Sequence, residues 1–202
     1  MLNGIDISHW NKKTINTGKI DLMSYAKNNF VIMKSSQGIS YRDSCLDYFV
    51  SSIFADGNLD KHIGFYHFAD AISEDSYVYE ATNFIAAVTP YKAYRPVLAL
   101  DVEASALQKK YIDIWSYNFL STCEKVFGYK PMIYLQQSAC KKFKQVAKGD
   151  FGLWVAKWGA KPTAKQIEPW KVYAIWQTGS KNNIDTDIFN GTDKAWFKYA
   201  GC

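Results

Sequence analysis

Short apolar segments of strand length alternate along this chain with longer segments whose apolar residues are spaced three and four apart. This order predicts β/α units, because a helix that crosses over between two strands lets them pair in parallel. The strand-like segments are residues 4–8, 30–35, 63–68, 96–102, 130–135, 152–157, 172–177 and 184–188. The segments between them that fit helices are residues 20–28, 43–56, 74–88, 107–127 and 138–147.

The final third of the chain has a different pattern. Its last two strand-like segments are separated only by residues 178–183, which are too few for a crossover helix. No linker, low-complexity tract or repeat divides the 202 residues. We therefore expect one α/β domain over residues 1–202. It would be a closed, TIM-barrel-like (β/α) barrel of about eight strands at residues 4–190, with few helices in its final third and a short C-terminal tail at residues 191–202.

Two acidic residues end the most apolar of these strands. Asp101 and Glu103 close the sequence Pro-Val-Leu-Ala-Leu-Asp-Val-Glu, and strand side chains alternate, so both carboxyl groups point to one side. Such a pair suits glycoside hydrolysis, in which one carboxyl group protonates the leaving oxygen and a second stabilises or attacks the sugar. The alternative is that the strand simply ends there and that solvent or a following helix satisfies both acids.

Further acids occur in the first and last strand-like segments. Asp6 lies within residues 4–8, and Asp185 and Asp187 lie within residues 184–188. In a β/α barrel the strand ends converge at one end, where sites form, although neighbouring polar residues could also satisfy each acid locally.

Aromatic residues make up 16% of the chain. Their rings pack in cores, and they also stack on sugars while their polar atoms form hydrogen bonds. Several fall near strand ends, beside the acids, and together they predict a polysaccharide cleft.

The distribution of charge and the spacing of possible metal ligands exclude further classes of function. The net charge of +5 comes from scattered lysines, which argues against nucleic-acid binding. The three histidines lack metal-ligand spacing, so we expect no structural or catalytic zinc. The four cysteines are expected to be free thiols, with a bridge between Cys123 and Cys140 as the alternative.

The first residues contain no basic region followed by a long apolar stretch, and no apolar run is long enough to span a membrane. We therefore expect synthesis in the cytoplasm without a signal peptide, and no membrane insertion.

Seven ordered motifs resemble those of glycoside hydrolase family 25, the lysozymes of the Chalaropsis or N,O-diacetylmuramidase type. They lie at residues 4–8, 34–38, 64–68, 100–103, 153–156, 175–177 and 184–185, so the resemblance runs from residue 4 to about residue 190. It implies an irregular, flattened β/α barrel that needs no cofactor. It also implies an N-acetylmuramidase that cleaves the β-1,4 bond between N-acetylmuramic acid and N-acetylglucosamine in bacterial peptidoglycan, with retention.

The resemblance also implies roles for individual residues. Glu103 matches the general acid/base, and Asp101 matches the acid that assists the substrate's 2-acetamido group as nucleophile, with direct attack by Asp101 as the alternative. Asp6 and Asp185 match two further acids of the cleft. The residues expected to line the sugar subsites are Tyr66, Tyr134, Trp154 and Gln177.

The chain departs from the family pattern at two positions. It has Gln37 where many members have Glu, and Asp187 where Asn is common. The loop between the last two strands is also short. These departures leave the proposed catalytic groups in place and bear on subsite preference.

The resemblance further implies a monomeric, phage-endolysin-like enzyme with a single catalytic domain and no wall-binding domain. It would reach the cell wall after a holin releases it from a phage-infected host. Two alternatives remain at this stage: a non-catalytic glycan-binding barrel and a chitinase-like glycosidase.

Overall fold

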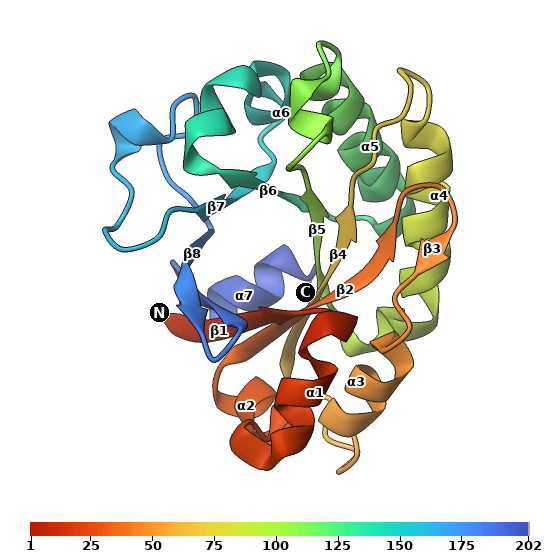
Figure 1. Cartoon of the computed structure of the whole chain (residues 1–202), viewed down its shortest axis with the longest axis vertical. Coiled ribbons are helices and arrows are strands. Elements are labelled where there is room, and N and C mark those ends of the chain that lie inside the picture. The colour runs from red at the N-terminus through yellow and green to blue at the C-terminus, as the bar shows by residue number, and fades with distance from the viewer. Residues whose placement is uncertain (202) are drawn as a thin grey trace.

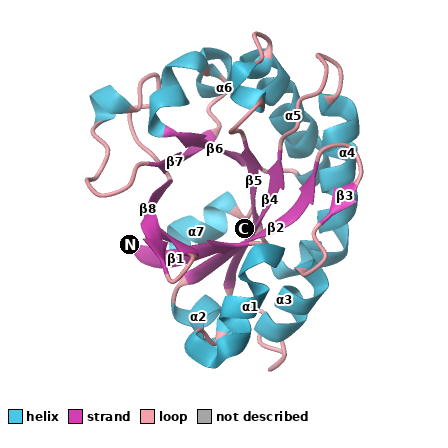
Figure 2. Cartoon of the chain, in the orientation of Figure 1, coloured by secondary structure: helices cyan, strands magenta, loops and turns pink. Residues whose placement is uncertain are grey.

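The strands of this protein lie side by side around a ring (Figures 1 and 2). The computed structural model describes residues 1–201, apart from the side chain of residue 19. The strands are β1 (Leu2–Ile7), β2 (Phe30–Gln37), β3 (Tyr41–Arg42), β4 (His62–Phe68), β5 (Val97–Asp101), β6 (Met132–Gln136), β7 (Gly152–Ala156), β8 (Ile175–Lys181) and β9 (Ile184–Phe189).

The sheet closes on itself. Its order is β1-β9-β8-β7-β6-β5-β4-β2-β3, and β1 also pairs with β2, so every strand except β3 belongs to a barrel. Neighbouring strands of the barrel run parallel except at β9, which is antiparallel to both β8 and β1. The expected closed α/β barrel of about eight strands is therefore confirmed. The two-residue strand β3, which pairs with the end of β2, was not predicted.

Helices surround the barrel (Figure 2). The α-helices are α1 (Lys12–Thr14), α2 (Leu22–Asn28), α3 (Leu46–Ile53), α4 (Tyr77–Val88), α5 (Ile112–Phe127), α6 (Lys144–Lys148) and α7 (Asp193–Tyr199). Short 3-10 or π-helical turns occupy His9–Asn11, Ile15–Lys19, Thr89–Tyr94, Ala106–Gln108, Gln137–Lys142 and Ala164–Gln166. The helical segments predicted before and between β2, β4, β5 and β6 contain α2, α3, α4 and α5, so they are confirmed.

Apolar packing forms two layers. Between the helices and the outer face of the barrel lie large side chains such as Phe49, Phe84 and Trp115, all almost fully buried. Inside the barrel a separate cluster fills the interior, and it includes Phe30 of β2 and Trp154 of β7. A barrel filled in this way is a packed core, so a ligand can bind only at its ends.

Spacings of three and four within residues 107–127 predict a buried stripe on α5, made of Ile112, Trp115, Phe119, Leu120 and Val126. The structure differs from this stripe at the last turn. Ile112, Trp115, Phe119 and Leu120 are buried as expected, but Val126 is 49% exposed and Phe127 is buried instead. The stripe continues from Cys123 to Phe127, four residues apart, and the helix ends at Gly128 in the left-handed conformation.

The structure also bears on the expectations for the cysteines and for membrane-spanning segments. Cys45, Cys123 and Cys140 are buried free thiols, so the alternative bridge between Cys123 and Cys140 does not form. Cys202 lies outside the described residues. Within residues 1–201, no helix combines the length and the apolar composition needed to cross a membrane.

Candidate active site

A pocket of about 240 Å³ opens at the end of the barrel where the parallel strands finish. We call it the acid pocket. Its lining consists of Asp6, Ser8, Trp10, Lys34, Tyr66, Phe68, Asp101, Glu103, Tyr134, Trp154, Gln177 and Asp185. The structure thus brings together all eight site residues singled out from the sequence, although they come from seven segments that are far apart along the chain.

β5 carries the central pair of acids. Asp101 is the last residue of the strand, and Glu103 follows two positions later. Backbone hydrogen bonds from Ala69 to Asp101 and from Val102 to Tyr134 fix this strand end between β4 and β6. The Oδ1 atom of Asp101 is buried and has no hydrogen-bond partner among the described residues. A buried acceptor left open in this way is available to a donor on a bound molecule.

Burial makes both acids of β5 hard to ionise. It raises the pKa of Asp101 well above its ordinary value, and the charge of Glu103 adds to the rise. Burial also raises the pKa of Glu103, and the charge of Asp185 adds to that effect. The ammonium group of Lys34 opposes both shifts. Glu103 can therefore hold a proton at a higher pH than an ordinary glutamate.

Asp6 and Asp185 face this pair from adjacent strands. They are direct partners in the antiparallel register of β1 and β9. The amide Nε2 of Gln177 donates to Asp6 Oδ2 at 2.8 Å and lies 3.5 Å from Asp185 Oδ2. Burial and the charge of Asp185 raise the pKa of Asp6 to about 7. Gln177 of β8 thus serves Asp6 in place of a neighbouring polar residue, whereas Asp185 also has a hydrogen bond with Ser180 of the same hairpin.

Asp187 lies behind the pocket and does not line it. Its side chain is 2% exposed, and its Oδ1 accepts a hydrogen bond of 2.8 Å from the indole Nε1 of Trp154. Burial, together with the charge of Asp6, raises the pKa of Asp187 well above its ordinary value. Burial therefore favours the neutral form of the Asp187 carboxyl group, which lies behind the floor of the pocket.

The predicted aromatic residues form that floor. Tyr134 and Trp154 contact each other edge to face with ring centroids 4.8 Å apart, and Tyr66 packs against Trp154 at 6.3 Å. Trp154 is only 1% exposed and Tyr66 only 9%. The hydroxyl group of Tyr134 donates to Gln177 Oε1 at 3.1 Å, which links this floor to the acids.

Two exposed tryptophans lie at the margins of the acid pocket. Trp10 lines it and is 80% exposed, and its ring packs beside His9, which Asp43 holds by a hydrogen bond of 2.9 Å. Trp158 is 63% exposed, and its Nε1 lies 3.3 Å from Gln177 Oε1. An indole kept this exposed on an anchored segment is available for stacking on a ligand.

The sequence analysis did not include four lining residues, Ser8, Trp10, Lys34 and Phe68. Ser8 and Phe68 stand at or just beyond a strand end, Trp10 follows β1 by three residues, and Lys34 lies within β2. A rule that treats every side chain at the carboxyl end of a barrel strand as a candidate would have found Ser8 and Phe68.

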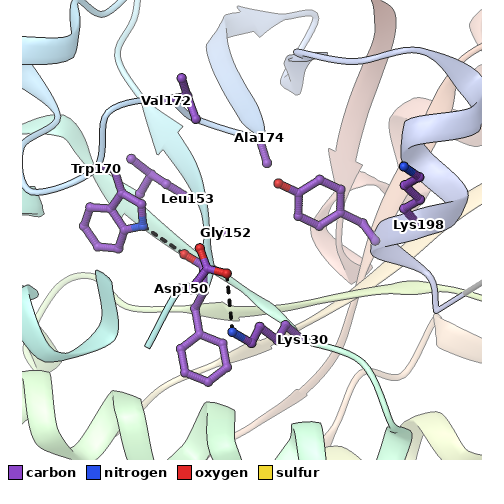
Figure 3. A pocket seen from close by; sticks show the side chains of 10 residues that line it. Lys130, Asp150, Gly152, Leu153, Trp170, Val172, Ala174 and Lys198 are labelled. Carbon is purple, nitrogen blue, oxygen red and sulfur yellow. Dashed lines mark hydrogen bonds and ion pairs between the residues drawn. The ribbon is translucent and has the colours of Figure 1, made fainter. Parts of the chain in front are cut away.

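A second pocket, of about 390 Å³, lies at the opposite end of the barrel, beside the start of β7 and α7 (Figure 3). Its lining includes a single carboxylate, Asp150, which is almost fully exposed and pairs with Lys130 at 3.5 Å. Trp170 directs its indole Nε1 to the backbone of Phe151. This pocket lacks a pair of acids, so the acid pocket is the candidate site for hydrolysis. In the described part of the chain, no three histidines, cysteines or acids are grouped so that they could hold a metal ion.

Solved structures with the same fold cover nearly the whole chain. A muramidase from Acremonium alcalophilum is 21% identical with a TM-score of 0.75, and the match covers 99% of both chains. A family 25 glycosyl hydrolase from Bacillus anthracis is 22% identical with a TM-score of 0.76, covering 99% of this chain and 94% of the other. The CTP1L endolysin is 24% identical with a TM-score of 0.71, covering 98% of this chain and 70% of the other.

A search of curated protein sequences found no match. The family model described as glycosyl hydrolases family 25, however, matches residues 5–187, which include every strand end that carries an acid of the pocket. This protein therefore belongs to glycosyl hydrolases family 25.

Proposed function

We propose that this protein is a lysozyme of the N-acetylmuramidase type. It would hydrolyse the β-1,4 bond between N-acetylmuramic acid and N-acetylglucosamine in bacterial peptidoglycan, with retention. The observation that carries the proposal is the acid pocket, in which Asp101 and Glu103 at one strand end face Asp6 and Asp185. Similar folds support the substrate class, because they include a bacterial lysozyme from Streptomyces coelicolor and the Cpl-1 endolysin complexed with a peptidoglycan analogue.

Glu103 is the proposed general acid and base. Its raised pKa, caused by burial and by Asp185, keeps a proton available to the leaving glycosidic oxygen at a higher pH than in an ordinary glutamate. Once the leaving sugar has accepted that proton, the carboxylate can take a proton from the water that attacks the sugar. One residue can serve both steps because retaining hydrolysis uses the same group first as acid and then as base.

Asp101 is proposed to orient the nucleophile. Its buried, open Oδ1 can accept the N–H of the substrate's 2-acetamido group, so that the acetamido oxygen is directed at the anomeric carbon. In the alternative mechanism, the Asp101 carboxylate itself attacks that carbon. Both routes need a negative group on the face of the sugar opposite Glu103.

The remaining residues bind and polarise the sugars. Asp6 and Asp185, joined through Gln177, offer acceptors to sugar hydroxyl groups, and the exposed rings of Trp10 and Trp158 offer stacking surfaces. We propose that the barrel acts on the bacterial cell wall as a monomer, in the manner of a phage endolysin. Endolysins among its structural neighbours support this assignment.

The experiment that tests the proposal identifies the new reducing ends. Purified Gram-positive peptidoglycan is digested, reduced with borohydride and analysed by mass spectrometry, with the Glu103→Gln variant and the control Glu74→Gln in parallel. Glu74 is exposed and does not line the acid pocket. Loss of the acid/base group should lower turnover by about 10²–10⁴-fold without preventing folding, and Glu74→Gln should match the wild type.

Muramitol at the new ends, from the wild type and the control, is the expected result. Glucosaminitol would leave the acid pair in place but refute the proposed bond. Wall binding without new ends from any variant would favour a glycan-binding barrel, and activity only on chitin oligomers would favour a chitinase-like glycosidase.

A further inference from the structure

Among the described residues, Lys34 is the one cation in the lining of the acid pocket, beside four carboxyl groups. It lies on β2, next to β4, and is only 7% exposed. Moving an ammonium group out of water is costly unless its surroundings use the charge. Lys34 is therefore not a solvated surface lysine.

The contacts of the Lys34 ammonium group hold it in place without cancelling its charge. Its Nζ donates to the amide Oε1 of Gln37 at 2.6 Å. It also lies over the ring of Phe68 at 4.7 Å and the ring of Tyr41 at 5.8 Å from the centroids. All three partners are neutral, so the positive charge remains available to act on the nearby acids.

Gln37 is itself fixed in one orientation. Its amide Nε2 donates to Asp70 Oδ1 at 3.0 Å, which leaves Oε1 directed at Lys34. The backbone N–H of Asp70 is anchored in turn by the buried carboxylate of Glu80 at 3.0 Å. A glutamate at position 37 would lack the donor that Asp70 requires and would form an ion pair with Lys34. Only a neutral amide satisfies both neighbours.

The charge of Lys34 acts on the two acids of β5. It lowers the pKa of both Asp101 and Glu103, against the burial and carboxylate repulsion that raise them. Burial lowers the pKa of Lys34, and the charges of Asp101, Asp43, Asp70 and Glu103 oppose this shift.

We propose that Lys34 is a positioning residue for hydrolysis, which acts through Asp101 and Glu103 by setting their ionisation, and that the neutral amide of Gln37 keeps the charge of Lys34 unpaired. This inference rests on the function proposed above. It adds a residue that need not touch the substrate, and it gives Gln37 a chemical reason to be glutamine.

The first test is the pH profile of kcat/KM on peptidoglycan. In Lys34→Met, loss of the cation raises the pKa of Glu103 and of Asp101, so both limbs of the bell-shaped profile should move to higher pH, by about one unit. Lys34→Arg retains the charge and should restore the wild-type position. Lys125→Met removes an exposed lysine of α5, changes the net charge equally and should leave the profile unmoved. Reduced activity in Lys34→Met at an unchanged profile would overturn the proposal.

Gln37→Glu tests the proposed role of the neutral amide of Gln37 while Lys34 is still present. Pairing with the new carboxylate should move the profile in the same direction as Lys34→Met, by a smaller amount. A profile identical to that of the wild type would refute the role of the neutral amide. This variant also keeps the proposal testable if Lys34→Met fails to fold.

The second test does not depend on activity. Glutamate labelled with ¹³C at the side-chain carboxyl group is incorporated, the Glu103 resonance is assigned from its loss in Glu103→Gln, and its titration is followed by NMR. The Glu103 midpoint should rise in Lys34→Met and in Gln37→Glu, and unchanged midpoints would overturn the inference. A protein that cleaves no peptidoglycan but shows these shifts would refute the proposed function and leave the electrostatic role of Lys34 in place.

Discussion

Asp185 and Asp187 lie two positions apart on β9, but the fold gives them different surroundings. Asp185 is half-buried and lines the acid pocket, whereas Asp187 is fully buried behind it. Burial raises the pKa of Asp187 well above its ordinary value, which favours the neutral carboxyl group, and that form has nearly the shape of an asparagine side chain.

The two isosteric substitutions should therefore have unequal effects. Asp187→Asn retains an Oδ1 acceptor for Trp154 and should change kcat/KM by less than about fivefold. Asp185→Asn removes a charge that raises the pKa of Glu103, so it should lower activity more and move the basic limb of the pH profile to lower pH. Kinetics on soluble peptidoglycan fragments across a pH series measure both effects. Greater damage from Asp187→Asn would mean that Asp187 works as an anion.

At the scale of elements, the β8–β9 hairpin determines where both of these acids stand. Its turn consists of Asn182 and Asn183, with φ angles of 55° and 60°. Two successive left-handed residues form the type of hairpin turn that matches strand twist, and asparagine tolerates this conformation better than most residues. The side chain of Asn11 also donates to the backbone oxygen of Asn183, which ties the turn to the segment after β1.

Changes at the turn should follow backbone preference. Asn183→Gly should leave the free energy of unfolding within about 0.5 kcal/mol, whereas Asn183→Val should lower it by about 1–2 kcal/mol, because a β-branched residue resists positive φ. Lys181→Val, on the adjoining strand, is the matched control and should be tolerated. Urea unfolding curves give these values. Equal stability of the valine and glycine variants would show that the turn can relax to another geometry.

At the scale of the whole molecule, α7 closes the end of the barrel opposite the acid pocket. The sequence analysis treated residues 191–202 as a short tail, yet the Trp196 side chain is fully buried within the inner cluster. Its ring contacts Phe30 at 4.7 Å and Phe189 at 5.2 Å between centroids. The C-terminal segment is therefore part of the core that holds the strands in place.

Trp196→Ala should lower the free energy of unfolding by about 3–5 kcal/mol, the cost of removing a large side chain from a packed interior. Trp196→Phe should cost much less, because the indole Nε1 has no hydrogen-bond partner among the described atoms. Chemical denaturation measures stability, and activity per folded molecule should stay near the wild-type value, since the pocket lies at the other end of the barrel. A loss below about 1 kcal/mol in the alanine variant would show that the barrel end closes without α7.

Local sequence patterns were sufficient to predict the strands of the barrel and the positions of their acids. Alternation places Asp101 and Glu103 on one side of β5, and spacings of three and four mark the buried faces of α3 and α4, because both patterns depend on residues close together in the chain. From these patterns the closed barrel and the four acids of the pocket could be predicted, and the resemblance to glycoside hydrolase family 25 added Tyr66, Tyr134, Trp154 and Gln177.

Only the tertiary structure decided what surrounds each of those residues. It placed Asp185 in the acid pocket and Asp187 behind it, and it placed Lys34 beside the acids. It also left Trp10 exposed and formed α7 within the segment expected to be a tail. Each of these outcomes depends on contacts between segments that are distant in sequence, such as the contact of Trp154 with Asp187 and that of Gln177 with Asp6. The burial and the neighbouring charges of a carboxyl group are set by closure of the barrel, so its ionisation cannot be read from the residues beside it in the chain.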